Sequence, residues 1–150
     1  MPNEIYNIIF NYDIGTGATP NEQFFFDRSR IPNQPYYVSF TFTSAIATLT
    51  NTYVANLFVD LGCSTTFLAS PSTVNNSYNS MYLGSLRVSG TGASNYLMAS
   101  EPDNPPIYLN CRPYNNNINI QIHENLITQM TDYSPAPGRY TLVLSFKAVS

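Results

Sequence analysis

Hydrophobic and polar residues alternate along much of this chain, and the alternation is clearest over its last stretch. From Tyr140 to Ala148, apolar side chains occupy every second position, and Thr141, Val143, Ser145 and Lys147 occupy the positions between them. Successive side chains of a β-strand point to opposite faces of the sheet. The period of two therefore predicts a strand with one dry face and one wetter face.

The same alternation predicts further strands, which are separated by residues that favour turns. We expect strands over residues 6–10, 23–27, 36–43, 53–61, 82–88, 96–99, 107–111, 118–122 and 140–148. Clusters of Gly, Pro, Asn and Ser stand between them, as in the loops of all-β proteins. No segment carries the sustained apolar stripe of an amphipathic helix, which argues against a parallel α/β sheet.

These patterns predict an all-β fold. About eight short strands with several long connections favour a single jelly roll, a β-sandwich of two antiparallel sheets. The length of 150 residues fits one domain, residues 1–150, which can bury about 70% of its unfolded surface. An immunoglobulin-like sandwich is the main alternative, but that fold usually has a buried tryptophan, and this chain has none.

The phase of each predicted strand also identifies a candidate core. The side chains expected between the two sheets are Phe40, Phe42, Leu57, Val59, Ile120, Leu142, Leu144 and Phe146. Each lies on the dry phase of its strand, so each should point inward.

The composition indicates a nearly neutral surface. Charged residues make up 10% of the chain, with one Lys, five Arg and a net charge of −3, against a usual charged fraction of about 25%. Such a surface favours packing against other protein over steering a charged ligand. Nucleic-acid binding relies on clustered Lys and Arg, so we expect no direct contact with nucleic acid.

The residues needed for catalysis are scarce. His123 is the only histidine, and it alternates with isoleucines on the wetter side of its strand, where an exposed or interface imidazole is expected more than a catalytic base. A Ser-His-Asp triad would have to use it, yet the chain has no Gly-x-Ser-x-Gly elbow. We therefore expect no enzyme, no catalytic residue and no cofactor-binding residue.

Metal ligands are equally sparse. Zinc sites of the usual kind need several His and Cys ligands, and this chain has one His and the distant pair Cys63 and Cys111. Glu101 and Asp103, with Asn104, can contribute to a calcium loop, but their spacing matches no loop motif and a solvated turn fits them as well. We expect no metal site.

The two cysteines leave their pairing open. Cys111 continues the dry side of its strand, so a buried thiol is expected. A Cys63–Cys111 disulfide would need their Cα atoms within about 7 Å, which a sequence does not determine. The start Met1-Pro2-Asn3-Glu4 lacks the basic and apolar regions of a signal peptide, and no stretch reaches the ~20 apolar residues of a membrane helix.

Several tyrosines are candidates for binding. Tyr37, Tyr78, Tyr108, Tyr114 and Tyr133 are expected to be exposed. Exposed tyrosines can stack on sugars, or they can anchor a protein interface because Tyr brings a large contact area at low entropic cost. Protein contacts are also expected from the loops 69–80 and 100–106 and the hairpin 131–138, which are too rich in Pro or Asn to be strands.

The second half of the chain resembles a known family. Residues 94–109 run into Cys111-Arg112-Pro113, and these are followed by the strand 118–122, a polar hairpin and the strand 140–146. This order is similar to small single jelly-roll capsid proteins of double-stranded DNA viruses, including giant viruses, virophages and polinton-like viruses. With the strand 36–43 and Asp60-Leu61-Gly62, the resemblance covers residues 30–150.

The resemblance implies a structural virion protein, either the penton at the five-fold vertex or another minor capsid subunit. Its partners would be identical copies in a ring, a homopentamer, together with a double jelly-roll major capsid protein and other minor capsid proteins. It would be made in the host cytoplasm and reside in the capsid, and the isolated chain would be monomeric or weakly associated. The chain lacks the inserted distal domain or long N-terminal arm of many pentons, which leaves its place in a shell open.

A second function remains open beside the structural one. A carbohydrate- or receptor-binding β-sandwich, of the lectin or fibre-head type, would use a groove lined by Tyr, Asn and Asp. Glycan binding in solution separates the two functions.

Overall fold

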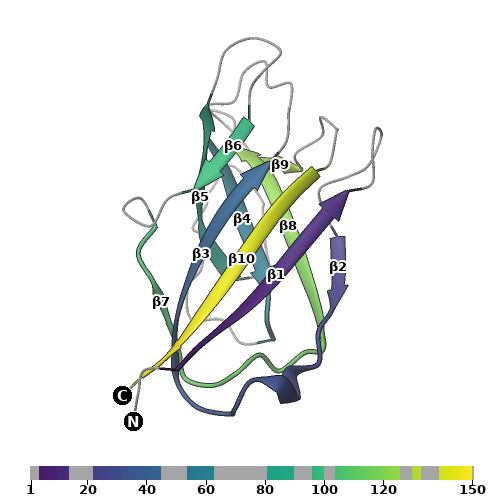
Figure 1. Cartoon of the computed structure of the whole chain (residues 1–150). Coiled ribbons are helices and arrows are strands. Elements are labelled where there is room, and N and C mark those ends of the chain that lie inside the picture. Colours follow the sequence, from purple (N-terminus) through teal and green to yellow (C-terminus); the bar gives the residue numbers. More distant parts are fainter. Residues whose placement is uncertain are drawn as a thin grey trace.

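The structure, a computed structural model, describes residues 4–13, 22–44, 54–62, 81–89, 96–99, 104–125, 130–132 and 139–149. Over these ranges the chain forms strands and one turn of 3-10 helix, η1 (Arg28–Arg30), as Figure 1 shows. The strands are β1 (Ile5–Asp13), β2 (Glu22–Phe25), β3 (Tyr36–Ser44), β4 (Val54–Asp60), β5 (Met81–Ser89), β6 (Tyr96–Ala99), β7 (Ile107–Leu109), β8 (Asn117–Asn125), β9 (Met130–Asp132) and β10 (Arg139–Ala148).

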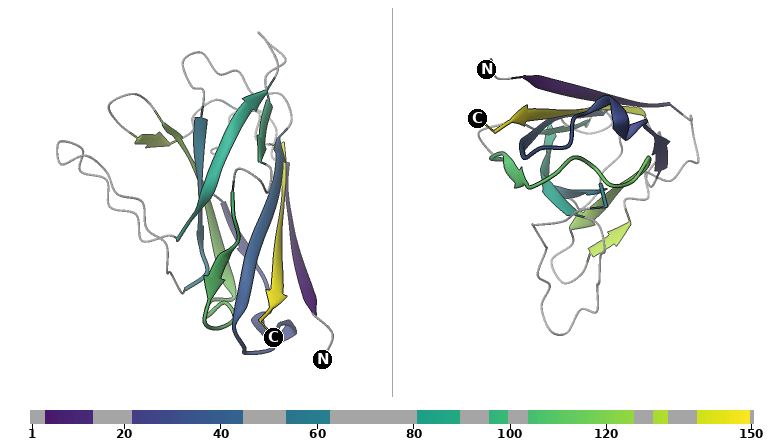
Figure 2. Two further views of the ribbon diagram at one scale, coloured as in Figure 1. Left: turned by 90° about the vertical axis from the view of Figure 1, so that its left-hand side faces the viewer. Right: turned by 90° about the horizontal axis from the view of Figure 1, so that it is seen from below.

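The strands form two antiparallel sheets that face each other, which the turned views make clear (Figure 2). One sheet has the order β1-β10-β3-β6, with β7 also paired to β3, and the other has the order β5-β4-β8-β2, with β9 paired to β8. A pairing between β5 and β6 joins the sheets along one side. This strand order is that of a jelly roll, so the predicted fold class is confirmed.

The first sheet has an unbroken register. Ile8 on β1 lies opposite Leu144 on β10, and Leu144 lies opposite Phe40 on β3. The pairing of β4 with β5 is less regular, because its register shifts between Leu57 and Phe58. A regular register keeps every inward side chain on one face, and β1, β10 and β3 therefore present two cleanly separated faces.

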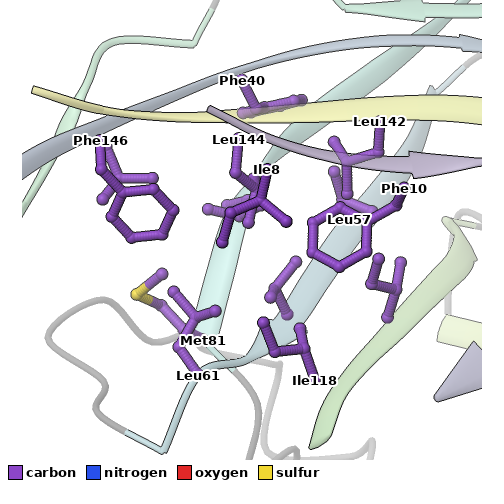
Figure 3. Packing of buried hydrophobic residues seen from close by; sticks show 14 of the residues in the cluster. Ile8, Phe10, Phe40, Leu57, Leu61, Met81, Ile118, Leu142, Leu144 and Phe146 are labelled. Atoms are coloured by element: carbon purple, nitrogen blue, oxygen red, sulfur yellow. The ribbon is translucent and has the colours of Figure 1, made fainter. Parts of the chain in front are cut away.

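The inner faces of the two sheets meet in a hydrophobic core (Figure 3). Ile8, Phe10, Leu142 and Leu144 of the first sheet point toward Leu57 and Ile118 of the second. All eight side chains expected in the core are buried, and the expectation is confirmed for Phe40, Phe42, Leu57, Val59, Ile120, Leu142, Leu144 and Phe146.

Aromatic contacts close the side of the sandwich that lies away from the β5–β6 pairing. The rings of Phe10 on β1 and Phe24 on β2 have centroids 5.1 Å apart in an edge-to-face arrangement. Because β1 and β2 are the two ends of the strand order, this contact brings the end strands of the two sheets together without a backbone ladder between them.

A buried asparagine links β5 to the segment between β6 and β7. The side-chain oxygen of Asn104 accepts a bond from the Ser85 backbone N–H at 2.8 Å, and its nitrogen donates to the Ser85 carbonyl at 3.0 Å. The side-chain amide of Asn104 thus satisfies the backbone N–H and C=O of Ser85, as a neighbouring strand would. A Cβ atom on Gly84 would collide with Asn104 and approach the Phe40 ring to 3.0 Å, so residue 84 must lack a side chain.

The structure corrects two expectations from the sequence, on Asn104 and on the start of the segment 131–138, and confirms a third, on Cys111. Asn104 is buried and bound to Ser85, so its side chain is not a free ligand of a solvated calcium turn; Glu101 and Asp103 lie outside the described residues. Residues 130–132 form β9, so the expectation that the start of the segment 131–138 is not strand was wrong. Cys111 carries a free, buried thiol, as expected, whereas Cys63 lies outside the described residues.

Candidate interaction surface

The outer side chains of the first sheet form one continuous surface, which we call the open face. It consists of Ile5, Asn7, Ile9 and Asn11 from β1, Thr141, Val143, Ser145 and Lys147 from β10, Tyr37, Ser39, Thr41 and Thr43 from β3, and Tyr108 from β7. All of these side chains are exposed or half-buried. Their chain neighbours on the same strands point into the core, which follows from the two-residue period of a strand.

The register arranges the open face in rows that cross the strands. One row contains Ile5, Lys147, Tyr37 and Tyr108, and a parallel row contains Ile9, Val143 and Thr41. Two other rows carry amide and hydroxyl side chains. The row of Asn7, Ser145 and Ser39 lies between the first two, and the row of Asn11, Thr141 and Thr43 lies beyond that of Ile9. Apolar and uncharged polar rows therefore alternate along the strands.

The polar rows are held in place by bonds between β1 and β10. Ser145 Oγ donates to Asn7 Oδ1 at 2.7 Å, and Thr141 Oγ1 donates to Asn11 Oδ1 at 2.9 Å. Such cross-strand pairs stabilise a sheet and fix the orientation of the side chains. A partner that covers this surface therefore meets side chains that are already ordered, which lowers the entropic cost of binding.

Large apolar groups stand on this surface. Ile5 is 56% exposed and Ile9 is 62% exposed, while Tyr37 and Tyr108 are each 46% exposed. The two tyrosine rings have centroids 5.7 Å apart at an interplanar angle of 65°. Single exposed apolar side chains are common, but a cluster on one face indicates a contact surface.

Among the residues that make up the open face as defined above, Lys147 is the only charged one, and it lies opposite Tyr37 on β3 and Ile5 on β1. At the far end of the two strands the same register continues to the paired residues Asp13 and Arg139. Covering a charged group requires its desolvation, which is expensive unless the partner supplies an opposite charge. An uncharged surface can be covered by protein without this cost, and charged residues are depleted at the centres of protein interfaces.

The outer face of the second sheet is different. Asn56 and Phe58 on β4 alternate with the core residues Leu57 and Val59, so they point away from the core. Nevertheless, Phe58 has no exposed surface and Asn56 is 5% exposed. The ring of Phe58 lies 5.6 Å from that of Tyr82 on β5. The folded chain thus covers this part of the second outer face with its own atoms.

Two of the arginines brace the loops at one end of the sandwich. Arg28 Nη1 donates to the Tyr114 carbonyl at 2.7 Å, and Arg112 Nη1 donates to the Ile31 carbonyl at 3.1 Å. These bonds tie the loop after β2 to the loop before β8. Both guanidinium groups are used within the fold, which gives them a structural role.

Asp27 begins the η1 turn in the same region. Its Oδ1 accepts from the Ser29 N–H at 3.0 Å and from Ser29 Oγ at 2.7 Å. The hydroxyl bond, the N–H bond and the charges of Arg30 and Arg112 hold the pKa of Asp27 below its usual value. The carboxylate is therefore a capping group of a loop.

The structure brings together some of the candidate residues named from the sequence. Tyr37 and Tyr108 are adjacent on the open face, whereas the exposed Tyr114 lies on the loop before β8. The backbone of His123 on β8 pairs with Asn56 and with Asp132. Tyr78 and Tyr133 lie outside the described residues, and within the described ranges no three His, Cys, Asp or Glu side chains are grouped to hold a metal ion.

Sequence reasoning located the interface in loops and did not identify the open face. Residues 69–80, and most of 100–106 and 131–138, lie outside the described residues. A usable signal was present on β1, where Ile5 and Ile9 occupy the wetter phase that Asn7 and Asn11 share. Apolar side chains on both phases of one strand are typical of strands that are buried on both faces, which indicates that a partner covers the outer face of β1.

Comparisons of the chain with protein-family models, with curated proteins and with solved structures found no match. No helix in the described part of the chain is long and apolar enough to cross a membrane. The protein is a single jelly roll with one uncovered, nearly uncharged outer face, and these two features are the basis of a functional proposal.

Proposed function

We propose that this protein is a structural subunit of a virion, either the penton of an icosahedral double-stranded DNA virus or another minor capsid subunit. The observation that carries the proposal is the open face, which lies on a rigid jelly-roll core and exposes Ile5, Ile9, Tyr37 and Tyr108 among uncharged side chains. The resemblance of the strand pattern over residues 30–150 to that of small jelly-roll capsid proteins gives further support.

The dimensions of the open face suit a protein contact. A strand of nine residues, such as β1, is about 30 Å long, and four strands side by side are about 19 Å wide. The face therefore covers on the order of 500 Å², a large part of the roughly 800 Å² that each partner contributes to a standard interface. A neighbouring subunit that also contacts flanking loops would complete an interface of ordinary size.

The proposed partners are identical copies in a ring, with five copies at a vertex, and the double jelly-roll major capsid protein around them. In a ring each subunit presents two different surfaces, one to each neighbour. The open face serves as one of these surfaces. Because its charge is low, it can lie against a neighbour without a matching pattern of opposite charges.

Incorporation into particles tests the proposal. The chain is co-expressed with a double jelly-roll major capsid protein encoded by the same genome, and particles are separated on a density gradient. We expect the chain in the particle fraction. A Thr41→Lys variant, with a charge at the centre of the open face, should stay in the soluble fraction. Its matched control, Asn110→Lys at an exposed loop position, should enter the particles.

The capsid role would be contradicted if the wild-type chain remained soluble when particles form. If Thr41→Lys and Asn110→Lys entered particles equally well, the capsid role would stand, but the open face would be ruled out as the contact surface.

A carbohydrate-binding function is favoured by one specific observation, the exposed ring pair of Tyr37 and Tyr108. Sugars stack on such rings through their apolar faces, and the hydroxyls of Ser39 and Ser145 lie together on the adjacent row. A glycan library binding to wild type and not to Tyr37→Ala, with Tyr114→Ala as the control for a remote exposed ring, would favour this function.

A further inference from the structure

The two sheets end in very different edge strands. The strand order begins with β1 and ends with β2, so each has a neighbour on one side only among the described strands. β2 has four residues, including Glu22, whereas β1 has nine. A row of unpaired backbone groups on a long edge strand is a template for pairing with another chain.

The backbone groups of β1 that face this edge can be identified. The Ala148 N–H donates to the Glu4 carbonyl at 3.0 Å. This pair continues by one residue the register in which Ile5 lies opposite Lys147. In an antiparallel ladder, hydrogen-bonded pairs alternate with pairs whose N–H and C=O groups point the other way. Ile5, Asn7, Ile9 and Asn11 therefore direct their N–H and C=O groups away from β10, toward the free edge.

Apart from Asp13 at its end, β1 lacks the features by which proteins protect an edge strand. Residues from Ile5 to Tyr12 include no proline, no glycine and no charged side chain. The pairing of β1 with β10 contains no bulge from Ile5 to Asp13. Short length, charge, proline and bulges are the usual protections, so this edge is suited to accept a further strand.

The composition of β1 favours a strand of identical sequence as its partner. Segments with high β-propensity, low charge and no proline pair readily with copies of themselves. Ile, Tyr and Phe occupy six of the eight positions in the sequence Ile-Tyr-Asn-Ile-Ile-Phe-Asn-Tyr. The two remaining positions, Asn7 and Asn11, carry no charge that would repel a second copy.

We infer that the free edge of β1 pairs with β1 of a second copy, antiparallel across a two-fold axis at Asn7. In this register Ile5 lies opposite Ile9 of the second copy, Asn7 lies opposite Asn7, and Ile9 lies opposite Ile5. All three pairs use residues whose backbone groups face the edge, so each exchanges two hydrogen bonds. The outer side chains meet apolar against apolar and amide against amide, which favours this register over its neighbours.

The contact joins two first sheets into one continuous sheet, and the open faces of both copies lie on the same side of it. A two-fold contact uses the same surface on both partners, whereas a ring requires two different surfaces. The edge contact is therefore additional to the ring contact of the proposed function and does not depend on it.

Cysteine cross-linking tests the register in the full-length chain. In a Cys63→Ser background, Asn7→Cys places one thiol on each side of the two-fold axis, with Cα atoms about 5.5 Å apart, within the range of a disulfide. We expect covalent dimer on mild oxidation, at least about ten-fold more than from Thr41→Cys, which lies at the centre of the open face, away from the edge. Circular dichroism melts confirm that the variants fold.

The register makes a further distinction between two edge positions. Ile5→Cys and Ile9→Cys should each form little dimer alone, and a mixture of the two should form the mixed dimer. Equal dimer from Asn7→Cys and Thr41→Cys, or none from Asn7→Cys at high protein concentration, would overturn the inference. The particle experiment with Thr41→Lys reports on the open face and not on the edge, so the two proposals fail separately.

Discussion

The two outer faces of this sandwich share an architecture and differ in what covers them. On the second sheet, the outward-pointing Phe58 is completely buried and packs near Tyr82. On the first sheet, the outward-pointing Ile9 is 62% exposed, and no other described strand lies over the outer side of β1 (Figure 2). The chain covers one apolar outer group with its own residues and leaves others of similar size bare.

Phe58 on the second sheet is covered by the chain itself, whereas Ile5 and Ile9 on the first sheet are left for another molecule to cover. Covering an isoleucine side chain fully is worth about 1.5–3 kcal/mol. For Phe58 this stabilisation is already part of the folding of the isolated chain. For Ile5 and Ile9 it becomes available only when another molecule covers them. The open face is thus a surface on which a partner can gain binding energy.

The largest expected difference separates these two faces directly. Phe58→Ala should lower the free energy of unfolding by about 3–5 kcal/mol, because it removes a buried ring and leaves a cavity. Ile9→Ala should change it by no more than about 0.5 kcal/mol, as for most exposed positions. Urea denaturation of both variants measures the difference. Equal effects would show that the two faces are not distinct in the folded chain.

A second prediction compares the two faces of one strand. Leu144→Ala on β10 should cost about 2–5 kcal/mol through lost burial and a cavity in the core. Val143→Ala, one residue earlier and on the open face, should cost under about 1 kcal/mol. Denaturation midpoints give both values. An unchanged midpoint for Leu144→Ala would place the wrong phase of β10 in the core.

A third prediction concerns the buried amide of Asn104, which links β5 of the second sheet to the segment between β6 and β7. Asn104→Ala should cost about 1–3 kcal/mol for each Ser85 backbone group left unsatisfied. Asn104→Asp keeps the acceptor for the Ser85 N–H and loses the donor to its carbonyl, so hydrogen exchange should show weaker protection around Ser85 in both variants. Full protection in Asn104→Ala would mean that another group satisfies Ser85.

The smallest expected effect is a pH dependence at the start of β1. The hydroxyl of Tyr6 donates to Glu4 Oε2 at 2.5 Å, and this bond raises the pKa of Tyr6 to about 12. The folded state holds the proton more tightly than the unfolded state does. The resulting stability is therefore present below a pH of about 10 and is lost between about 10 and 12.

Tyr6→Phe isolates this contribution. Melting temperatures of wild type and variant, measured from pH 9 to pH 12, should converge as the pH rises. Parallel curves would show that Tyr6 does not titrate in this range with a raised pKa.

The sequence predicted what depends on local alternation, and it missed what depends on contacts between distant segments. The inner faces of β3, β4 and β10 followed from a period of two, because the hydrophobic effect requires those side chains to be inside. The segments 96–99 and 107–111 were expected as strands, but their shared position beside β3 was not, since it depends on pairing between segments far apart in the sequence. β9 was also missed, because its pairing with β8 is set by tertiary structure.

The candidate surface was the less predictable part for the same reason. Tyr37 and Tyr108 were named individually as exposed tyrosines, but only the register of β3 with β7 places them side by side. The exposure of Ile9 and the burial of Phe58 are likewise invisible in the pattern, because both residues are apolar and both lie on the outward phase of a strand. What covers each of them is decided by the fold.

The most direct test of the central claim is the reactivity of a single cysteine on the open face, in the free chain and in particles. In a Cys63→Ser background, Thr41→Cys should react rapidly with a maleimide in the free chain, because position 41 is exposed. In particles formed with the major capsid protein, the thiol of Thr41→Cys should be protected from the maleimide. The control Asn110→Cys, on the exposed loop, should lose less of its free-chain reactivity than Thr41→Cys, or none of it. Undiminished reactivity of Thr41→Cys in particles would contradict the claim that the bare face of this jelly roll is its contact surface.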